Sequence, residues 1–148
     1  MELARPARTD DRQACTRLLS QALVAAESMR GGAALVGGAT TVTLLERWTG
    51  ADATAHLIVG EYEGVVVGLG AVTAAAGPRG LIECCYVETG ARGVGVGTAL
   101  MEAAVAWCSE RRCETVDALA LPGDRTTKQR LEAAGFTARL LTLSRRLG

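Results

Sequence analysis

This sequence has no surplus of charge of either sign, which argues against a nucleic-acid binder. Sixteen lysines and arginines balance sixteen aspartates and glutamates, and the two signs are mixed along the chain. Nucleic-acid binders usually present a basic face. Long apolar runs are also missing: none approaches the roughly 20 residues of a membrane-spanning helix. The first six residues lack the apolar core of a signal peptide, so we expect a cytoplasmic protein without a membrane or nucleic-acid partner.

Residues that bind metals or form disulfides are scarce as well. His56 is the only histidine, and it has no partner at ligand spacing, so we expect no metal site. The five cysteines are an odd number and contain no Cys-x-x-Cys pair. Neighbouring Cys84 and Cys85 would point to opposite faces of a strand, which suits separate packing roles better than a disulfide. A reducing cytoplasm is the simplest compartment for such a chain.

What the sequence does contain is a run of alternating glycines, Arg92-Gly93-Val94-Gly95-Val96-Gly97-Thr98. Glycines allow a ligand to approach the backbone closely. A strand-like run over 81–87 leads into this loop, and a helical pattern begins at Thr98. Because the first N–H groups of a helix have no partner inside it, a glycine loop that opens a helix binds anions. The sequence therefore predicts a phosphate or pyrophosphate site.

Two common phosphate loops do not match this run. A P-loop needs a lysine after its last glycine, and the only lysine of the chain is Lys128. A dinucleotide fingerprint needs a third glycine where this sequence has Thr98. An oxidoreductase with a Rossmann nucleotide site is therefore disfavoured.

The order Arg-x-x-Gly-x-Gly at Arg92, Gly95 and Gly97, with Tyr86-Val87 upstream, resembles the acetyl-CoA loop of the GCN5-related N-acetyltransferase (GNAT) superfamily. Gly135-Phe136 matches the Gly-Phe pair that follows the last helix of that family. These motifs cover residues 81–136, and the rest agrees in element order. The resemblance implies acetyl-CoA as cosubstrate. The residues implied to bind it are Tyr86 and Val87 for the pantetheine arm, and Arg92, Gly93, Val94, Gly95, Gly97 and Thr98 for the pyrophosphate.

The expected fold class is α/β (α+β), as one domain over residues 1–148, since 148 residues with 49% hydrophobic content suit one full core. The resemblance implies a mixed, mostly antiparallel sheet with helices on both faces and a strand splayed at the CoA site. The predicted elements of the front half are a strand over 2–8, a helix capped by Thr9 that runs to about Ala26, a loop over 30–39, a helix over 41–48 and a hairpin of 56–62 and 65–73. A turn at 78–80 follows, and then a strand over 81–87 and a helix over 98–112 with Arg111 and Arg112 in its last turn. The last predicted elements are a strand over 115–121, a helix from Asp124 to Gly135 and a closing strand.

Glu83 is the candidate general base, because it is the sole charged residue inside an apolar strand. This placement suggests a carboxylate at a cleft wall with a raised pKa, although an exposed strand face is an equally good interpretation. Glu61 and Glu63 are expected to be solvated hairpin residues, and His56 is not favoured for proton transfer. The resemblance also implies that a backbone N–H near Tyr86 or Val87 stabilises the oxyanion.

The general acid is unassigned. The family often has a tyrosine four residues before its Gly-Phe pair, and here that position holds Leu131, which cannot donate a proton. A thiol has a pKa of about 8.5, so its thiolate leaves tolerably well without an acid.

Two functions remain open. The leading one is an acetyl-CoA-dependent N-acetyltransferase that acts directly on a primary amine of a small molecule or peptide. The alternative is a non-catalytic module that binds or senses acyl-CoA, which the loss of the tyrosine motivates. The sequence does not identify the acceptor. The segment after Phe136 is short for the family's final pair of strands, and a second copy of the chain could cover the sheet edge left open.

Overall fold

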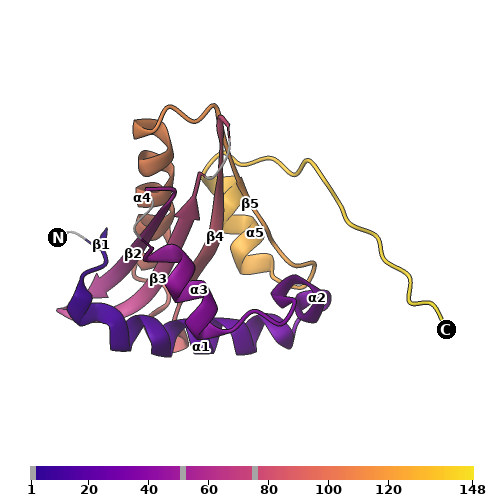
Figure 1. Cartoon of the computed structure of the whole chain (residues 1–148), viewed down its shortest axis with the longest axis horizontal. Coiled ribbons are helices and arrows are strands. Elements are labelled where there is room, and N and C mark those ends of the chain that lie inside the picture. The colour runs from indigo at the N-terminus through magenta and orange to yellow at the C-terminus, as the bar shows by residue number, and fades with distance from the viewer. Residues whose placement is uncertain (1–2, 51–52, 75–76) are drawn as a thin grey trace.

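The computed structural model describes residues 3–50, 53–74 and 77–148, and Figure 1 shows a central sheet with helices on both faces. The elements in chain order are β1 (Ala4–Pro6), η1 (Thr9–Asp11), α1 (Arg12–Glu27), α2 (Gly32–Val36), α3 (Thr41–Trp48), β2 (Ala55–Tyr62), β3 (Val65–Thr73), β4 (Arg79–Val87), η2 (Thr89–Ala91), α4 (Val96–Glu110), β5 (Thr115–Ala118) and α5 (Arg125–Ala133). The five strands lie in the order β1-β2-β3-β4-β5. Only β4 and β5 are parallel, so the mixed, mostly antiparallel sheet is confirmed.

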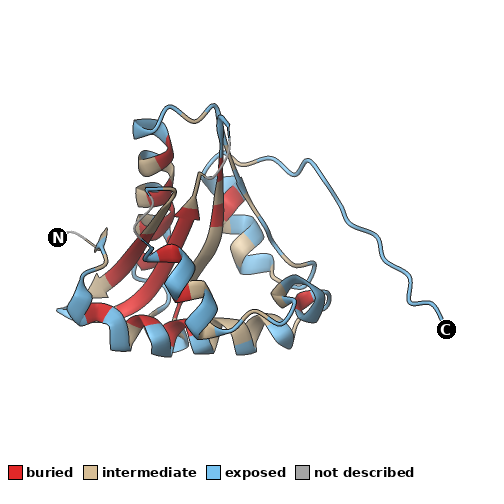
Figure 2. Ribbon diagram, viewed as in Figure 1, coloured by how far each residue is buried: buried red, intermediate tan, exposed pale blue. Residues whose placement is uncertain are grey.

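The sheet has a hydrophobic core on each face. Side chains alternate along a strand, so Ile58 of β2 packs with α4 while its neighbour Val59 packs with α1. α1 and α3 cover one face, and α4 with Leu131 of α5 covers the other. Because both faces are covered, β2 and β3 contain runs of consecutive buried residues, which appear red in Figure 2.

Glycines under α4 bring the start of this helix close to the sheet. Gly60 of β2 and Gly68 of β3 are cross-strand partners. A Cβ on Gly60 would lie 2.3 Å from Cγ1 of Val96, and one on Gly68 would lie 3.0 Å from the same atom. At the other end of the helix, a Cβ on Gly80 would lie 2.4 Å from Sγ of Cys108. The position of α4 therefore depends on these small residues.

Arg5 ties the first strand to its neighbours. Its guanidinium donates to both carboxylate oxygens of Asp11, at 2.8 and 3.0 Å, and to Oε1 of Glu61 at 2.8 Å. The hydrogen bonds from Arg5 lower the pKa of Asp11 against the effect of burial. Glu61 was predicted to be a solvated hairpin residue, and this is wrong, because Arg5 binds it beside the bulge between Gly60 and Glu61.

Several predicted elements are confirmed with small shifts of their ends. The 41–48 helix and the strand over 65–73 have the predicted bounds, and the hairpin turns at Glu63 and Gly64, both with positive φ. Asp124 caps α5 by accepting from Thr127 N at 3.1 Å. Cys84 and Cys85 lie on opposite faces of β4, as expected. The first strand is shorter than predicted, and residue 2 lies outside the described residues.

Other predictions about the front half are wrong. Residues 30–39 are not only a loop, because α2 forms between Gly31 and Gly37, both in the left-handed region. The alanines and leucine between these glycines are good helix formers, so the glycines bound the helix. Thr9 does not cap α1: it begins η1, and the carboxylate of Asp11 accepts from Arg8 N at 2.7 Å.

The back half also differs from the prediction. β4 begins at Arg79, inside the predicted 78–80 turn, and β5 ends at Ala118. α4 runs over Val96–Glu110, so Arg111 and Arg112 lie beyond its last turn, where Arg112 has φ 62°. The closing strand is wrong: in the described part of the chain, no strand follows α5. None of the described helices has the length and hydropathy needed to cross a membrane.

Candidate functional site

The glycine loop lies between β4 and α4, as the sequence predicts. Gly93 and Gly95 have φ of 89° and 95°, and Gly95 is the N-cap of α4. The first helical hydrogen bond runs from Ala99 N to the Gly95 carbonyl at 3.0 Å. The N–H groups of residues 96–98 therefore have no acceptor inside the helix, and they lie at the positive end of its dipole.

A pocket of about 270 Å³ opens at this helix start. Its lining is Val87, Ala91, Arg92, Gly93, Gly95, Val96, Gly97, Thr98 and Arg130. Six of the eight residues predicted to bind CoA belong to this lining. The other two do not: Val94 lies on the exposed side of the loop, and the side chain of Tyr86 packs on the α1 face, where its hydroxyl lies 3.2 Å from Oε1 of Gln21.

Two arginines border the pocket. Nε of Arg92 donates to the Val87 carbonyl at 3.0 Å, and its guanidinium lies over the Tyr86 ring, 5.8 Å from the centroid. Arg130 of α5 lies against Gly97, where a Cβ would be 2.4 Å from its Cζ atom. The described lining contains no carboxylate. Such an arrangement can bind an anion of the size of a pyrophosphate.

Sequence reasoning missed Arg130. The helical pattern of α5 did contain a signal for it. Leu131 enters the core under α4, and because successive residues of a helix point in different directions, Arg130 must point away from that core. Arg130 also approaches Cys85 of β4. Burial raises the pKa of the Cys85 thiol, and the nearby guanidinium of Arg130 opposes this rise only in part.

β4 and β5 diverge beside the pocket. They pair only between Arg79–Ile82 and Thr115–Ala118, so residues 83–87 have β3 on one edge and, among the described residues, no strand on the other. The expected splayed strand is therefore confirmed. Its open edge leads from the middle of β4 to the glycine loop.

Glu83 is the extra residue of a β-bulge in β4. Ile82 pairs with Val72 and Cys84 pairs with Ala71, which leaves Glu83 without a partner across the ladder. Glu83 and Cys84 therefore share the α1–α3 face. Arg47 of α3 binds the Glu83 carboxylate through both terminal nitrogens, at 2.9 and 2.5 Å. The Glu83 side chain is 17% exposed and that of Arg47 is 53% exposed.

The expected rise in the pKa of Glu83 is wrong. Burial does act to raise this pKa, but hydrogen bonds from Arg47 and Thr73, the charge of Arg47 and the indole of Trp48 together outweigh it, and the net shift is downward. The Trp48 indole is the smallest of these contributions to the lowered pKa of Glu83. Its buried Nε1 lies outside hydrogen-bond geometry to any described acceptor. The carboxylate is thus ionised at neutral pH and held by its arginine.

His56 lies beside the end of α4 that is opposite to the glycine loop. Its ring stacks on Trp107 near the end of α4, with centroids 5.7 Å apart and an interplanar angle of 2°. Arg111 covers the same indole at 4.3 Å. Burial, then the charge of Arg111, lowers the pKa of His56. No group of three or more histidine, cysteine or acidic side chains that could hold a metal occurs among the residues described.

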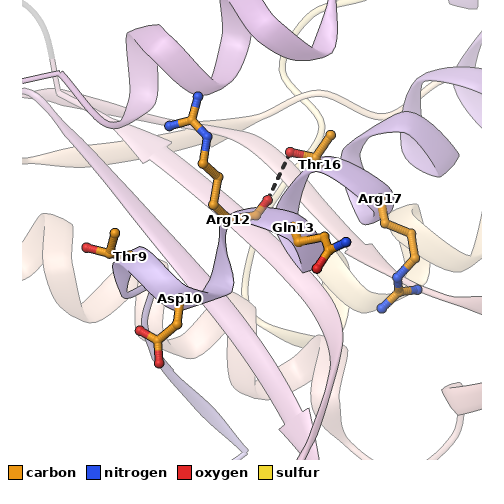
Figure 3. Close-up of a pocket in the computed structure, with 6 residues that line it drawn as sticks. All are labelled: Thr9, Asp10, Arg12, Gln13, Thr16 and Arg17. Carbon is orange, nitrogen blue, oxygen red and sulfur yellow. Dashed lines mark hydrogen bonds between the residues drawn. The ribbon is translucent and has the colours of Figure 1, made fainter.

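A larger hollow of about 630 Å³ lies elsewhere, over η1 and the start of α1. Figure 3 shows that its lining side chains spread over the surface instead of converging. The hydrogen bond drawn among them runs from the Thr16 hydroxyl to the Arg12 carbonyl, 2.9 Å away within the same helix. This hollow offers no candidate chemistry, so the smaller pocket at α4 is the candidate functional site.

The model of the acetyltransferase (GNAT) family matches residues 35–139, which is more than half of the chain. The chain belongs to the GNAT acetyltransferase family. The matched segment includes the whole loop, the pocket and the divergent strands. No curated protein sequence is significantly similar to the chain.

Several solved structures share this fold at low identity. The aminoglycoside acetyltransferase AAC(6')-Iy, in complex with a CoA bisubstrate analogue, superposes with a TM-score of 0.73 at 16% identity, over 97% of each chain. A ribosomal-protein-alanine N-acetyltransferase from Brucella melitensis biovar Abortus gives 0.70 at 17% identity, over 97% of this chain and 98% of its own. A mutant of the BH1408 protein from Bacillus halodurans gives 0.76 at 15% identity, over 98% and 99%. These likenesses concern the fold.

Proposed function

We propose that this protein is an acetyl-CoA-dependent N-acetyltransferase that transfers an acetyl group directly to a primary amine of a small molecule or peptide. The observation that carries the proposal is the pocket at the start of α4, where free helix N–H groups, Arg92 and Arg130 meet without a carboxylate. The CoA complexes of AAC(6')-Iy support the choice of cosubstrate.

In this proposal, the loop binds the pyrophosphate through Arg92, Gly93, Val94, Gly95, Gly97 and Thr98. Arg130 adds a second cation from the opposite wall. The pantetheine arm follows the open edge of β4 beside Tyr86 and Val87, where backbone groups lack a neighbouring strand. Acetyl-CoA supplies the acetyl group, and the protein orients it by these contacts.

Glu83 is our candidate base on the acceptor side. Its carboxylate is ionised and can receive the proton that the amine loses as the C–N bond forms, because nitrogen becomes more acidic once it donates its electron pair. Arg47 is a positioning residue that keeps Glu83 charged and directed by their two hydrogen bonds. Leu131 is buried in the core under α4 and supplies no proton, so the thiolate leaves without an acid from this position.

The test combines calorimetry with detection of thiol release. Purified protein should bind acetyl-CoA, and an amine panel with aminoglycosides and amino-terminal peptides should contain an acceptor that releases free thiol. The matched variant Glu83→Gln should still bind acetyl-CoA, but its turnover should fall by about 100-fold, which is a typical rate contribution of a general base. Absence of acetyl-CoA binding would refute the proposal at its first step.

A second function, acyl-CoA binding without catalysis, is favoured by one observation. Leu131 occupies the core instead of the cofactor pocket, so the residue that often acts as the acid is missing. This alternative predicts acetyl-CoA binding, no thiol release with any amine and no effect of Glu83→Gln. Turnover that depends on Glu83 would exclude it.

We also propose a cytoplasmic location, without nucleic-acid or membrane partners. All five cysteines are free thiols, which suits a reducing compartment. Fractionation of cells that express the tagged full chain would test the location.

A further inference from the structure

α4 ends in a Schellman motif that brings two cysteines together. Arg111 caps the helix, and Arg112 follows in the left-handed region with φ of 62°. Arg112 N donates to the Ser109 carbonyl at 3.0 Å, and Cys113 N donates to the Cys108 carbonyl at 3.0 Å. These are the two hydrogen bonds that define the motif. Cys108 and Cys113 hold the two positions whose side chains commonly pack together in it.

The backbone of this turn holds the two cysteines within the reach of a disulfide. Because Cys113 N binds the Cys108 carbonyl at 3.0 Å, standard bond lengths keep the two Cα atoms within about 7 Å, which is the upper limit for a disulfide. Both side chains pack in the core cluster under α4, and the two thiols are close enough to interact. The distance therefore permits a bond between the two sulfur atoms without a shift of the helix.

The two thiols differ in their access to solvent. Cys108 is 3% exposed, and a Cβ on Gly80 would lie 2.4 Å from its Sγ atom. Burial, and then the neighbouring Cys113, raise the pKa of Cys108 to about 11, so this group is a neutral thiol at pH 7. Cys113 is half-buried, and its chain neighbours Arg112 and Glu114 are exposed. Cys113 is therefore the thiol that a dissolved oxidant reaches first, and Cys108 is placed to react with the product.

We propose that Cys108 and Cys113 form a reversible disulfide when the protein meets hydrogen peroxide. Peroxide transfers one oxygen atom to the Cys113 sulfur, which becomes a sulfenic acid, and one water leaves. The Cys108 sulfur then attacks the Cys113 sulfur, the S–O bond breaks, and the hydroxyl leaves as a second water with the thiol proton of Cys108.

Two thiols are thereby oxidised to one disulfide, and one peroxide is reduced to two waters. Exchange with reduced glutathione restores both thiols and yields oxidised glutathione. In a reducing compartment the bond is therefore transient, which agrees with the free thiols of Cys108 and Cys113 in the structure.

Peptide mapping of the full chain after peroxide treatment tests this bond. Two trypsin sites lie between the cysteines, at Arg111 and Arg112, so the two thiols fall in separate peptides, 93–111 and 113–125. After alkylation of the remaining thiols, mass spectrometry without reduction should find these peptides joined, with the loss of about 2 Da that a disulfide requires. Treatment with reduced glutathione before digestion should give the two peptides separately.

Single substitutions separate the roles of the two thiols. In Cys108→Ser, Cys113 should accumulate as a sulfenic acid that dimedone labels, because no thiol remains to react with it. In Cys113→Ser, dimedone should not label Cys108, because this side chain is buried. Cys15→Ser is the matched control, since Cys15 is also buried but packs on the other face of the sheet. It should form the joined peptides as the parent protein does.

Separate peptides in the treated parent protein would overturn the proposal, whether Cys113 stays a thiol or proceeds to a sulfinic acid. So would a bond from Cys113 to a second copy of the chain, which would double the mass on a non-reducing gel. Equally fast formation of the joined peptides in urea would also overturn it, because the short spacing in the chain and not the helix end would then account for the bond. Each of these outcomes is independent of whether acetyl-CoA binds.

Discussion

At the scale of single residues, a substitution of Arg130 should weaken cofactor binding without affecting the stability of the fold. Arg130→Gln removes a cation from the pocket, while Leu131 continues to anchor α5 in the core. A hydrogen bond to a charged group contributes about 1.5–3 kcal/mol, so acetyl-CoA affinity should fall by roughly tenfold or more. Calorimetry measures the affinity, and the melting temperature should not change. Arg125→Gln, on an exposed position of the same helix, is the control. Equal affinities of the two variants would show that Arg130 does not contact the cofactor.

Arg47 gives a second prediction at this scale, on pH dependence. The pKa of Glu83 is low because its hydrogen bonds and the Arg47 charge outweigh burial. In Arg47→Gln, burial then dominates, and this pKa should rise. The acidic limb of the kcat/KM profile should therefore move to higher pH. Arg12→Gln, at an exposed position of α1, should leave the pH profile of kcat/KM unchanged. An unmoved limb in Arg47→Gln would mean that Glu83 is not the group that titrates.

At the scale of elements, the glycines under α4 determine where the start of this helix and the glycine loop lie. Gly60→Ala places a Cβ 2.3 Å from Val96, and such overpacking costs about 1–3 kcal/mol. We expect a lower melting temperature together with weaker acetyl-CoA binding, because Val96 is also the first residue of α4. The control is Gly123→Ala, whose added Cβ meets no atom within 4 Å. A variant at Gly60 with unchanged stability would contradict this account of the helix position.

The sequence predicted the elements that depend on residues close together in the chain. α1 and the β2–β3 hairpin follow from apolar spacing and from turn residues at Glu63-Gly64. The start of α4 could not be predicted from local spacing. It depends on the room that Gly60 leaves for the side chain of Val96, and these two residues are distant in the chain. The same holds for Arg47, whose pairing with Glu83 depends on how α3 packs across β4. Local spacing also could not reveal α2, where two glycines bound a helix of five residues.

At the scale of the whole molecule, the Arg5 cluster makes stability depend on pH. The pKa of Asp11 is lowered in the folded protein, first by hydrogen bonds from Arg5. Its stabilising effect is therefore complete above the ordinary aspartate pKa of about 3.9 and is lost as the pH falls through the lowered value. Asp11→Asn should reduce the free energy of unfolding by about 2 kcal/mol at neutral pH.

This difference should shrink toward zero as the pH falls through the lowered pKa of Asp11, where the aspartate of the parent protein also becomes neutral. Urea unfolding at several pH values measures it. Asp10→Asn, at the exposed neighbouring position, should follow the parent at every pH. A gap that stayed constant with pH would mean that Asp11 stabilises the fold by packing and not by charge.

The bulge at Glu83 has a consequence for the length of β4. If this residue were deleted, Ile82 and Cys84 would become neighbours in the chain, and they already face Val72 and Ala71 across a continuous stretch of β3. Ile82, Cys85 and Val87 would keep their places on the α4 side, and Cys84 and Tyr86 would keep theirs on the α1 side. The hydrophobic core would thus accept a strand one residue shorter, with a more regular ladder. The extra residue in β4 is the one that brings a carboxylate to Arg47.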